Sequence, residues 1–524
     1  MSASERAPDA RVTDSRPGLA WLAGFGVLLA MACFGVFEAW SLRSSLWEDE
    51  LIAITHGLQP AWSLPIEVLR NDIHPFLYFL LLKGWTAFNR GSDQWALASS
   101  IVCLLFSTFV LYKTVARYHG TTAALWSVAV LCSLPYFPWA ASNLRMYALM
   151  PATALLCWVA NRSMLGEGSW KSAAFMLFVQ LAHAYTHAIG FFFCAFIALA
   201  ALIDDYRATP RQNFQRWLIV QFVFALAVLP VLGNSLVRGT ERLAAPDLTG
   251  MLAYPVQLIW AWDWQLAGPL AFIAGAAYWV LVLLGVAHVR SRISTAVMCI
   301  GVLLACITFG MLGKPMFKAP VYMANILPFM AMGVGAGVSR ATSLAVRLGV
   351  GAIVVAMACW SMWSARVPHL EENYKPAALY VKQHAKPGDV VVVPHYSVFW
   401  GVARYAVAPE WGAPLEVMPL NPNAAWARLL AKLGPVWTQR LGLVPKTDYL
   451  LSNGVRYVTG VNATGHTERP VNVWIIDRMN YDETVELATP VKVQEVVRFG
   501  VEMAVLRATP DAQGIKLIPN PLVP

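Results

Sequence analysis

Three consecutive carboxylates follow the first apolar stretch of the chain, in the segment Trp47-Glu48-Asp49-Glu50. Like charges this close raise one another's pKa, and partial removal from water next to a membrane adds to the effect. Crowded acidic groups of this kind are typical of sites that bind a cation or take up a proton. The same residues also fit a solvated first helical turn, where the helix dipole favours negative charge. The residues alone leave both interpretations open.

Two basic groups stand at the ends of apolar runs. His74 precedes Pro75 where the chain re-enters an apolar stretch, and an imidazole there could donate a hydrogen bond to a phosphate or a carboxylate. Arg145, two residues before Tyr147, lies between two apolar runs. An arginine in such a place must reach water, pair with an acid or meet an anionic ligand. Both groups also fit ordinary polar residues of a membrane interface.

Histidines and lysines mark two further segments. His183 and His187 are four residues apart, a spacing that on one helical face would let both bind a single metal ion. No third ligand is adjacent, which favours contact with a substrate or a neighbouring helix. Lys314 and Lys318 precede Tyr322 at the start of another apolar span. Their ammonium groups could bind a phosphate or anchor the span at the interface.

Acidic, basic and aromatic groups at the ends of apolar runs suit one class of reaction. The chain has no Walker motif, no dinucleotide-binding fingerprint and no Ser-His-Asp pattern. Transfer from a phosphate-linked lipid to an acceptor hydroxyl needs an acidic group as base and basic groups that hold the departing phosphate. The combination therefore indicates this chemistry.

Long apolar segments must position these residues. The chain is 58% hydrophobic and 13% charged, whereas a soluble protein is about 45–50% apolar and about 25% charged. A helix needs roughly 20 apolar residues to cross a bilayer. Two stretches, 75–113 and 145–204, must hold several spans each, and about 11 to 13 crossings are expected in total. Single spans are expected at 18–40, 121–140, 216–234, 269–289, 293–312, 320–339 and 345–365.

Charge predicts the orientation of the chain. The net charge of +9 comes from basic residues near span ends, as the positive-inside rule requires, and no basic run is dense enough to bind nucleic acid. We expect residues 1–17 to form a cytoplasmic tail and 41–74 to form the first outer loop. Strict alternation through 75–113 would place Lys113 and Arg117 outside. One stretch there is therefore expected not to cross, and either to re-enter the membrane or to lie in the interface.

The composition changes after residue 365. Strand-like runs at Val390–Val393, Val471–Ile476 and Val501–Leu506 surround a helical pattern at Lys375–His384, with a turn signal at residues 386–389. We predict an α-helical polytopic membrane protein whose transmembrane module is 18–365, followed by a small soluble α/β domain at 366–524. All eight cysteines lie before this domain, which therefore does not rely on disulfides.

The order of the motifs resembles the C-type superfamily of membrane glycosyltransferases, in particular the glycosyltransferase 39 type. This group includes protein O-mannosyltransferases and the aminoarabinose transferases that modify lipid A. The resemblance covers most of residues 20–340. It rests on four segments in order, which are Leu46–Glu50, His74–Trp85, Arg145–Tyr147 and Tyr185–His187.

The resemblance implies a polyprenyl-phosphate sugar donor and an inverting transfer at the extracytoplasmic face of a bacterial inner membrane. Asp49 matches the catalytic acid position and would be the general base, with Glu50 supporting the site or a cation. His74 stands where relatives place a group that faces the donor phosphate. Arg145 and Tyr147 match an arginine–tyrosine pair that shapes the donor site. The C-terminal domain would then lie outside the membrane.

Two positions depart from the family pattern. Phe76 stands where relatives have a second proline after the histidine. Val321 stands before Tyr322 where relatives carry an arginine that binds the leaving phosphate. Lys318 lies one helical turn earlier and is the expected substitute. We therefore expect Lys318 and Tyr322 to bind substrate together with His187.

The sequence leaves several points open. It does not identify the sugar, and the acceptor could be a glycan, a lipid or a protein. A divalent cation at Asp49 and Glu50 is permitted and is not required. Two other classes of function compete with the enzyme. A flippase for lipid-linked sugars would predict inverted repeats and broken helices at mid-membrane, which the sequence does not display. The other is a non-catalytic envelope assembly protein.

Overall fold

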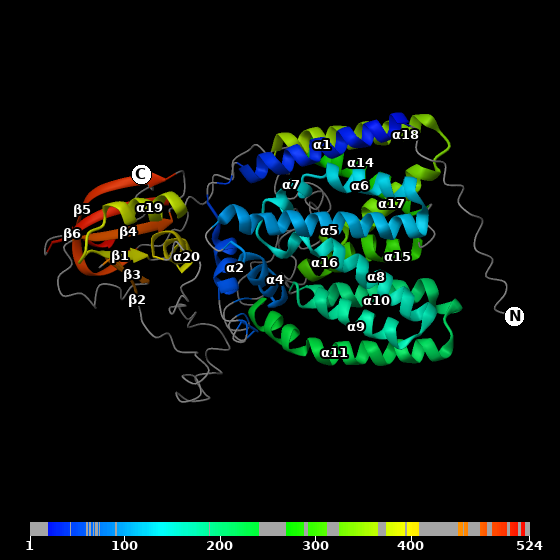
Figure 1. Ribbon diagram of the computed structural model, residues 1–524, viewed down its shortest axis with the longest axis horizontal. Helices are drawn as coiled ribbons and strands as arrows, with labels where there is room; N and C mark the ends of the chain where they lie inside the picture. Colours follow the sequence, from blue (N-terminus) through cyan, green and yellow to red (C-terminus); the bar gives the residue numbers. More distant parts are fainter. Residues whose placement is uncertain are drawn as a thin grey trace. The chain divides into compact units, whose positions relative to one another are not determined.

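The computed structural model contains a group of helices and a second group of elements that includes a β-sheet (Figure 1). The structure describes residues 19–41, 43, 45–58, 61, 64–65, 68, 72, 74–89, 92–187, 189–239, 269–287, 292–311, 324–364, 374–393, 396–407, 449–453, 455–459, 472–478, 485–499, 503–511 and 515–518. Within these ranges, some side chains near the ends are not described.

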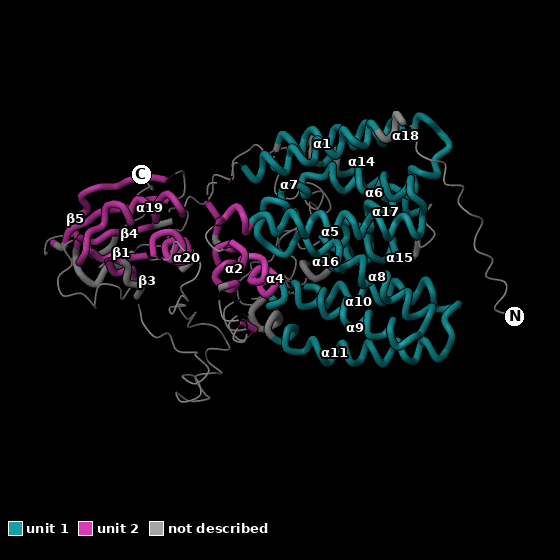
Figure 2. Tube along the Cα trace, in the orientation of Figure 1, with its two compact units in different colours: residues 1–41, 73–78, 97–367 teal, residues 42–72, 79–96, 368–524 magenta. Residues whose placement is uncertain are grey.

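The chain divides into two compact units (Figure 2). Unit 1 comprises residues 1–41, 73–78 and 97–367. Unit 2 comprises residues 42–72, 79–96 and 368–524. Most of the predicted first outer loop therefore belongs to the same unit as the C-terminal domain.

Unit 1 is a bundle of helices. Among its pairs, α6 packs against α17, α14 against α17, and α8, α9 and α10 against one another. The bundle helices are α1 (Leu19–Ser41), α5 (Asp93–His119), α6 (Thr121–Ser133), α7 (Tyr136–Ala141), α8 (Met150–Glu167), α9 (Trp170–Ala184), α10 (Gly190–Asp205), α11 (Arg211–Gly239), α14 (Pro269–Val286), α15 (Arg292–Ala296) continuing through the π-helical turn Val297–Gly301 into α16 (Val302–Met311), α17 (Leu327–Arg340) and α18 (Leu344–Ser364).

Four helical stretches of the described residues are long and apolar enough to span a membrane. They are Ala23–Ser41, Asp93–His119, Arg211–Gly233 and Leu344–Trp363. Shorter apolar helices at Thr121–Ser133, Gly275–Val286 and Ser294–Ala305 accompany them. The predicted polytopic helical class is confirmed, and the number of 11 to 13 crossings stays a prediction.

Two expected spans differ from the helices observed. The stretch 121–140 is two helices, α6 and α7, because Pro135 follows the end of α6 and lacks the N–H that would continue it. α4 (Leu77–Thr86) has 10 residues. At about 1.5 Å per residue it is about half as long as the hydrocarbon core is thick. The expectation that one stretch within 75–113 fails to cross therefore fits α4.

Glycines let three helices of unit 1 approach closely. A Cβ atom on Gly335 of α17 would lie 2.6 Å from the carbonyl oxygen of Ala123 on α6. A Cβ on Gly285 of α14 would lie 2.1 Å from the carbonyl oxygen of Gly333 on α17. Because helices in lipid gain their association energy from such close packing, these glycines hold α6, α14 and α17 together.

Unit 2 contains a seven-stranded mixed sheet in the order β2-β3-β1-β4-β6-β5-β7. β1 pairs in parallel with β3 and β4, and the other neighbours are antiparallel. Helices α19 (Tyr374–His384) and α20 (Tyr396–Val402) both contact β4. The strands are β1 (Val390–Val393), β2 (Tyr449–Ser452), β3 (Val455–Thr459), β4 (Val473–Arg478), β5 (Val485–Phe499), β6 (Met503–Pro510) and β7 (Ile515–Ile518).

A buried aspartate fixes the start of this sheet. Asp389, at the end of the predicted turn, is fully buried. Its carboxylate accepts the Lys386 N–H at 2.9 Å and the Trp474 indole N–H at 3.0 Å. It also accepts the backbone and amide N–H groups of Asn472 at 3.1 and 3.0 Å. These donors satisfy a charge that would otherwise be costly to bury, and they tie β1 to β4.

The remaining elements of unit 2 come from the first half of the chain. α2 (Glu48–Leu58) packs against α20, and residues 79–96 contribute the rest of α4 and the first turn of α5. The indole N–H groups of Trp85 and Trp95 each donate to the other residue's carbonyl oxygen, at 2.7 and 3.0 Å. Their rings stack with centroids 4.6 Å apart. This reciprocal pair fastens the end of α4 to the start of α5.

Candidate functional site

Unit 1 brings four of the predicted site residues together. The rings of His74 and His187 lie 4.6 Å apart, and the ring of Tyr147 lies 5.9 Å from that of His187. Arg145 acts electrostatically on His74. All four side chains are buried, with 4% or less of each residue exposed. We call these residues the Arg145–His74 cluster.

The loop before α4 holds His74 in place. The backbone N–H of Leu77 donates to the carbonyl oxygen of Tyr185 at 3.1 Å. Phe76 meets the Tyr185 ring edge-on, with centroids 5.4 Å apart. The phenylalanine that departs from the family pattern therefore packs on another of the matching segments. Its contact helps to bring His74 next to His187.

Tyr147 is set by the short helices that follow α6. Its carbonyl oxygen accepts the Tyr136 hydroxyl at 2.7 Å, and its ring lies 5.3 Å from that of Trp139. Both partners belong to α7, which exists because the chain turns at Pro135. Arg145 precedes the 3-10 turn Met146–Ala148 in an extended conformation. The break between α6 and α7 thus positions the residues that pack against Tyr147.

Charge in the cluster comes from Arg145. Burial, and then the nearby Arg145 guanidinium, hold the pKa of His74 well below its usual value of 6.5. His74 is therefore neutral at pH 7, and one of its ring nitrogens carries a proton that it can donate. A guanidinium beside neutral imidazoles is an arrangement that favours an anion with several oxygen atoms.

The two histidines of the 183–187 segment have different environments. α9 ends at Ala184, so His183 and His187 do not share a helical face, and that expectation was wrong. The Nδ1 atom of His183 lies 2.7 Å from the Thr153 hydroxyl. The Nδ1 atom of His187 accepts the Ile189 N–H at 3.2 Å, which leaves the proton of the neutral ring on Nε2. His187 is thereby fixed as an Nε2 donor.

Unit 2 carries the predicted acidic residues. Asp49 lies partly exposed in the first turn of α2, and Glu50 is fully buried beside it. The Glu50 carboxylate forms an ion pair with Arg43 and accepts the Trp47 N–H at 3.0 Å. Its charge is already balanced, and its bonds close the start of the helix. Glu50 thus supports the segment, while Asp49 presents its carboxylate at the helix N-terminus.

A buried pair in unit 2 was not singled out from the sequence. His56, near the end of α2, places Nε2 3.6 Å from Oδ2 of Asp72. The His56 ring also lies 4.9 Å from that of Phe79. Asp49 and His56 are seven residues apart, two helical turns, and this spacing was the one available signal. The pairing of His56 with Asp72 depends on how the folded chain brings residue 72 back to α2, and no local sequence pattern predicts it.

Some predicted residues cannot be placed. Lys318 and Tyr322 lie outside the described residues, as does the side chain of Glu48. Within the described part of the chain, no three His, Cys, Asp or Glu side chains gather closely enough to hold a metal ion. Asp49 and Glu50 lie in unit 2, and the four residues of the Arg145–His74 cluster lie in unit 1.

Comparison with known proteins identifies the fold. No protein-family model and no curated protein matches the chain. The crystal structure of ArnT from Cupriavidus metallidurans bound to undecaprenyl phosphate matches 94% of this chain and 98% of its own, with a TM-score of 0.57 and 10% identity. Its apo structure matches 93% and 98%, with a TM-score of 0.55 and 11% identity.

The chain is also similar, more distantly, to a third solved structure. The Archaeoglobus fulgidus oligosaccharyltransferase, solved with Zn and sulfate, covers 72% of this chain and 61% of its own, with a TM-score of 0.48 and 10% identity. At identities near 10%, the ArnT match is evidence about the fold. The chain has the fold of the C-type membrane glycosyltransferases that its motifs resemble.

Proposed function

We propose that this protein transfers a glycosyl group from a polyprenyl-phosphate-linked sugar to an acceptor hydroxyl at the extracytoplasmic face of a bacterial inner membrane. The fold supports the class of reaction, since ArnT has the same architecture and was solved with undecaprenyl phosphate bound. The acceptor is a hydroxyl of a glycan, a lipid or a protein.

The Arg145–His74 cluster is the observation that carries the proposal. It combines a permanent cation, the fixed Nε2 donor of His187 and a neutral His74 in buried surroundings. In such surroundings electrostatic attraction is stronger than in water. A departing phosphate gains negative charge as the bond to the sugar breaks. The cluster would therefore stabilise the transition state more than the ground state, as catalysis requires.

The proposed step is a single displacement. The acceptor oxygen attacks the anomeric carbon and forms the new C–O bond. The bond from that carbon to the phosphate oxygen breaks, and its electron pair leaves with polyprenyl phosphate. The Asp49 carboxylate takes the proton of the acceptor hydroxyl. Attack opposite the leaving group inverts the anomeric carbon.

Asp49 and Glu50 have separate roles in this proposal. Glu50 is paired with Arg43 and anchors the start of α2. Asp49 is partly exposed, so an acceptor hydroxyl can reach its carboxylate. A divalent cation, if one takes part, would bind at Asp49, because the charge of Glu50 is already compensated. Lys318 and Tyr322 stay proposed substrate-binding residues.

The length of α4 supports the orientation. If α1 crosses outward, α4 stays in the outer interface and α5 crosses inward, then Lys113 and Arg117 lie in the cytoplasm. This arrangement obeys the positive-inside rule, which strict alternation does not. It leaves Asp49 on the extracytoplasmic side, and the C-terminal domain, which belongs to the same unit as Asp49, would lie on that side too.

A turnover assay tests the proposal. The purified protein in lipid nanodiscs is given a panel of polyprenyl-phosphate hexoses and pentoses with cell-envelope extract as acceptor. We expect release of polyprenyl phosphate, which mass spectrometry detects. Arg145→Gln should slow the release by about 10- to 100-fold, because a hydrogen bond to a charged group contributes about 1.5–3 kcal/mol.

Arg347→Gln is the matched control, because Arg347 is an exposed arginine of α18 and should leave turnover unchanged. Two results would contradict the proposal. One is movement of the sugar lipid between leaflets of proteoliposomes without release of polyprenyl phosphate, which would identify a flippase. The other is full turnover by Arg145→Gln.

A further inference from the structure

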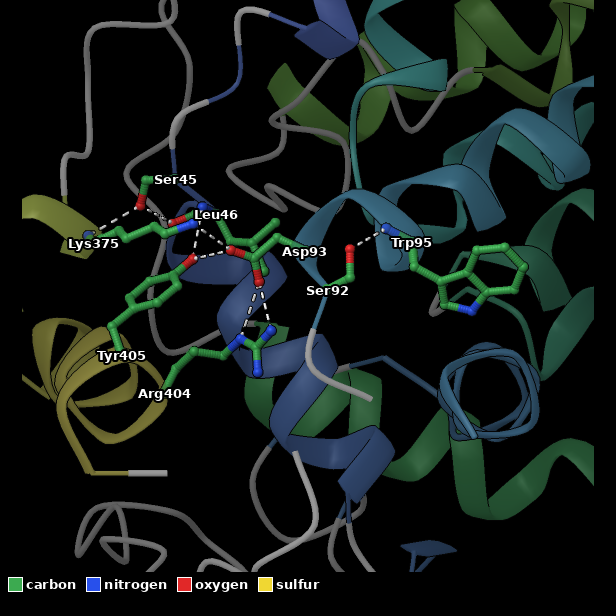
Figure 3. Close-up of polar contacts among 8 residues, drawn as sticks. All are labelled: Ser45, Leu46, Ser92, Asp93, Trp95, Lys375, Arg404 and Tyr405. Carbon is green, nitrogen blue, oxygen red and sulfur yellow. Dashed lines mark hydrogen bonds and ion pairs between the residues drawn. The ribbon is translucent and has the colours of Figure 1, made fainter. Parts of the chain in front are cut away.

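Asp93 is the centre of a polar cluster in unit 2 (Figure 3). Its Oδ1 atom accepts the Arg404 guanidinium, from Nε at 3.1 Å and from Nη2 at 2.6 Å. Its Oδ2 atom accepts the Tyr405 hydroxyl at 3.1 Å and the Lys375 ammonium at 3.4 Å. Three residues of the C-terminal domain therefore converge on one carboxylate from the first half of the chain. Lys375 comes from α19, and Arg404 and Tyr405 from the π-helical turn Ala403–Val407.

The carboxylate is held firmly on its own side. Asp93 is the first residue of α5, and the preceding Ser92 accepts the Trp95 N–H at 3.1 Å as a helix cap. The stacked, reciprocally bonded pair of Trp85 and Trp95 joins this turn to the end of α4. The backbone at Asp93 is therefore held in place by the helix cap and by the tryptophan pair.

The Tyr405 hydroxyl extends the cluster to the segment before Asp49. While it donates to Asp93, it accepts the backbone N–H of Leu46 at 3.2 Å. The neighbouring Ser45 hydroxyl accepts the backbone N–H of Lys375 at 3.3 Å. Leu46 is fully buried. Two hydrogen bonds with the C-terminal domain therefore hold the consecutive residues Ser45 and Leu46.

The first turn of α2 begins directly after these two bonded residues. The Trp47 carbonyl oxygen accepts the N–H groups of Glu50 and Leu51 at 3.0 and 2.9 Å, and Glu50 bonds back to the Trp47 N–H. Asp49 lies inside this closed turn. A continuous series of bonds therefore leads from Asp93 through Tyr405, Leu46 and Trp47 to the turn that carries Asp49.

We infer that Asp93 is a positioning residue, which acts through Tyr405 and Leu46 to fix the turn that presents Asp49. The inference rests on the proposed role of Asp49 as general base. It gives the C-terminal domain a part in catalysis, because that domain supplies Arg404, Tyr405 and Lys375. A domain that only captured acceptors would not need bonds to the backbone before Asp49.

The chemistry of Tyr405 suits this role. Its ring is buried, and burial and then the Asp93 charge raise the pKa of its phenol above the usual value of 10. The hydroxyl therefore keeps its proton and donates to Asp93 at every physiological pH. Its lone pairs remain available for the Leu46 N–H. Phenylalanine would preserve the packing and lose both bonds, whereas replacement of Asp93 would remove the carboxylate that pairs with the buried Arg404 and would disturb the whole cluster.

The test combines hydrogen exchange and kinetics on the full-length Tyr405→Phe protein. Tyr380→Phe is the control, since Tyr380 of α19 is partly exposed and its hydroxyl bonds to Glu495, outside the Asp93 cluster. Exchange of the backbone amides of residues 42–50 should accelerate in Tyr405→Phe, because the Leu46 N–H loses its partner. The kcat should fall by about 10- to 100-fold, with KM for the donor changed less than about twofold, because small misplacement of a catalytic group slows chemistry. The control should match the wild type in every measurement.

The outcomes separate this inference from the proposed function. Unchanged exchange at residues 42–50 would overturn the inference, whatever the activity. Faster exchange with unchanged kcat would also overturn it, since Leu46 would then be fixed without benefit to catalysis. Absence of transfer by the wild type with every donor would refute the proposed function and with it the catalytic role given to Asp93. Faster exchange together with the selective loss of kcat supports the inference.

Discussion

Chemically similar residues that are close in the sequence have different environments in this protein. Asp49 and Glu50 are consecutive acids, yet Glu50 is buried against Arg43 and Asp49 is partly exposed. His183 and His187 are four residues apart, yet one lies against Thr153 and the other against His74. The helical period explains the first difference, because neighbours on a helix point in different directions. The end of α9 explains the second.

The environment of His74 makes a prediction about pH. Its folded-state pKa lies well below 6.5, whereas the unfolded chain has about the ordinary value. Below pH 6.5 the unfolded state therefore binds a proton that the folded state does not. The free energy of unfolding should therefore decrease as the pH falls below about 6.5 and continue to decrease toward the folded-state pKa of His74.

Replacement of His74 by glutamine removes the proton-binding site and keeps an amide donor. The thermal unfolding midpoint in detergent should therefore fall less between pH 7 and pH 5 for His74→Gln than for the wild type. His384→Gln, which changes an exposed histidine of α19, serves as the control and should follow the wild type. Identical pH profiles for His74→Gln and the wild type would mean that His74 is not buried next to a cation.

At the scale of elements, small residues decide how closely the helices of unit 1 approach. Gly285, Gly333, Gly335 and Gly337 lie where α14 and α6 meet α17, and a Cβ on any of these except Gly333 would come within 2.6 Å of a neighbouring atom. Some glycines of other helices have open space around them. Gly349 of α18 has nothing within 4 Å of the place a Cβ would occupy. These two classes of glycine allow a matched comparison.

Gly335→Ala should destabilise the protein by about 1–3 kcal/mol, because its methyl group would overlap Ser127 and the Ala123 carbonyl of α6. Gly349→Ala should be neutral or stabilise by up to about 1 kcal/mol, since alanine is the better helix former. Unfolding in detergent followed by circular dichroism measures both. Equal stability of the two variants would contradict the close approach of α6 and α17.

Local sequence pattern predicted many of these elements. The expected strand Val390–Val393 is β1, the expected helix Lys375–His384 is α19 less its first residue, and the first span matches α1 within a residue. Each rests on a signal within a few residues, such as a run of valines or a Pro-Gly turn. The division of 121–140 into α6 and α7 was missed, although Pro135 marks it, because the apolar run continues through the break.

Across the whole molecule, contacts between distant segments could be predicted only where the resemblance to a family supplied them. His74, Arg145, Tyr147 and His187 were singled out, and their meeting in unit 1 followed from the order of motifs in the resembling family. Asp93 has no such signal. It looks like an ordinary helix start, and its partners Arg404 and Tyr405 lie more than 300 residues away.

The same limit applies to the division of the chain. The composition change after residue 365 predicted a C-terminal α/β domain, and the structure has one. Composition gave no sign that residues 42–72 and 79–96 cluster with that domain in unit 2. Pairings such as that of Leu46 with Tyr405 produce this grouping, and they depend on the folded chain.

The proposed reaction depends on a base at Asp49 and a phosphate site at Arg145 that act in one transfer. The most direct test separates binding from chemistry in Asp49→Asn. This variant should bind polyprenyl phosphate with a Kd within about twofold of the wild type, because the Arg145–His74 cluster is intact. Its single-turnover transfer rate should fall by about 100-fold or more, as loss of a general base predicts. Transfer by Asp49→Asn at the wild-type rate would contradict the account.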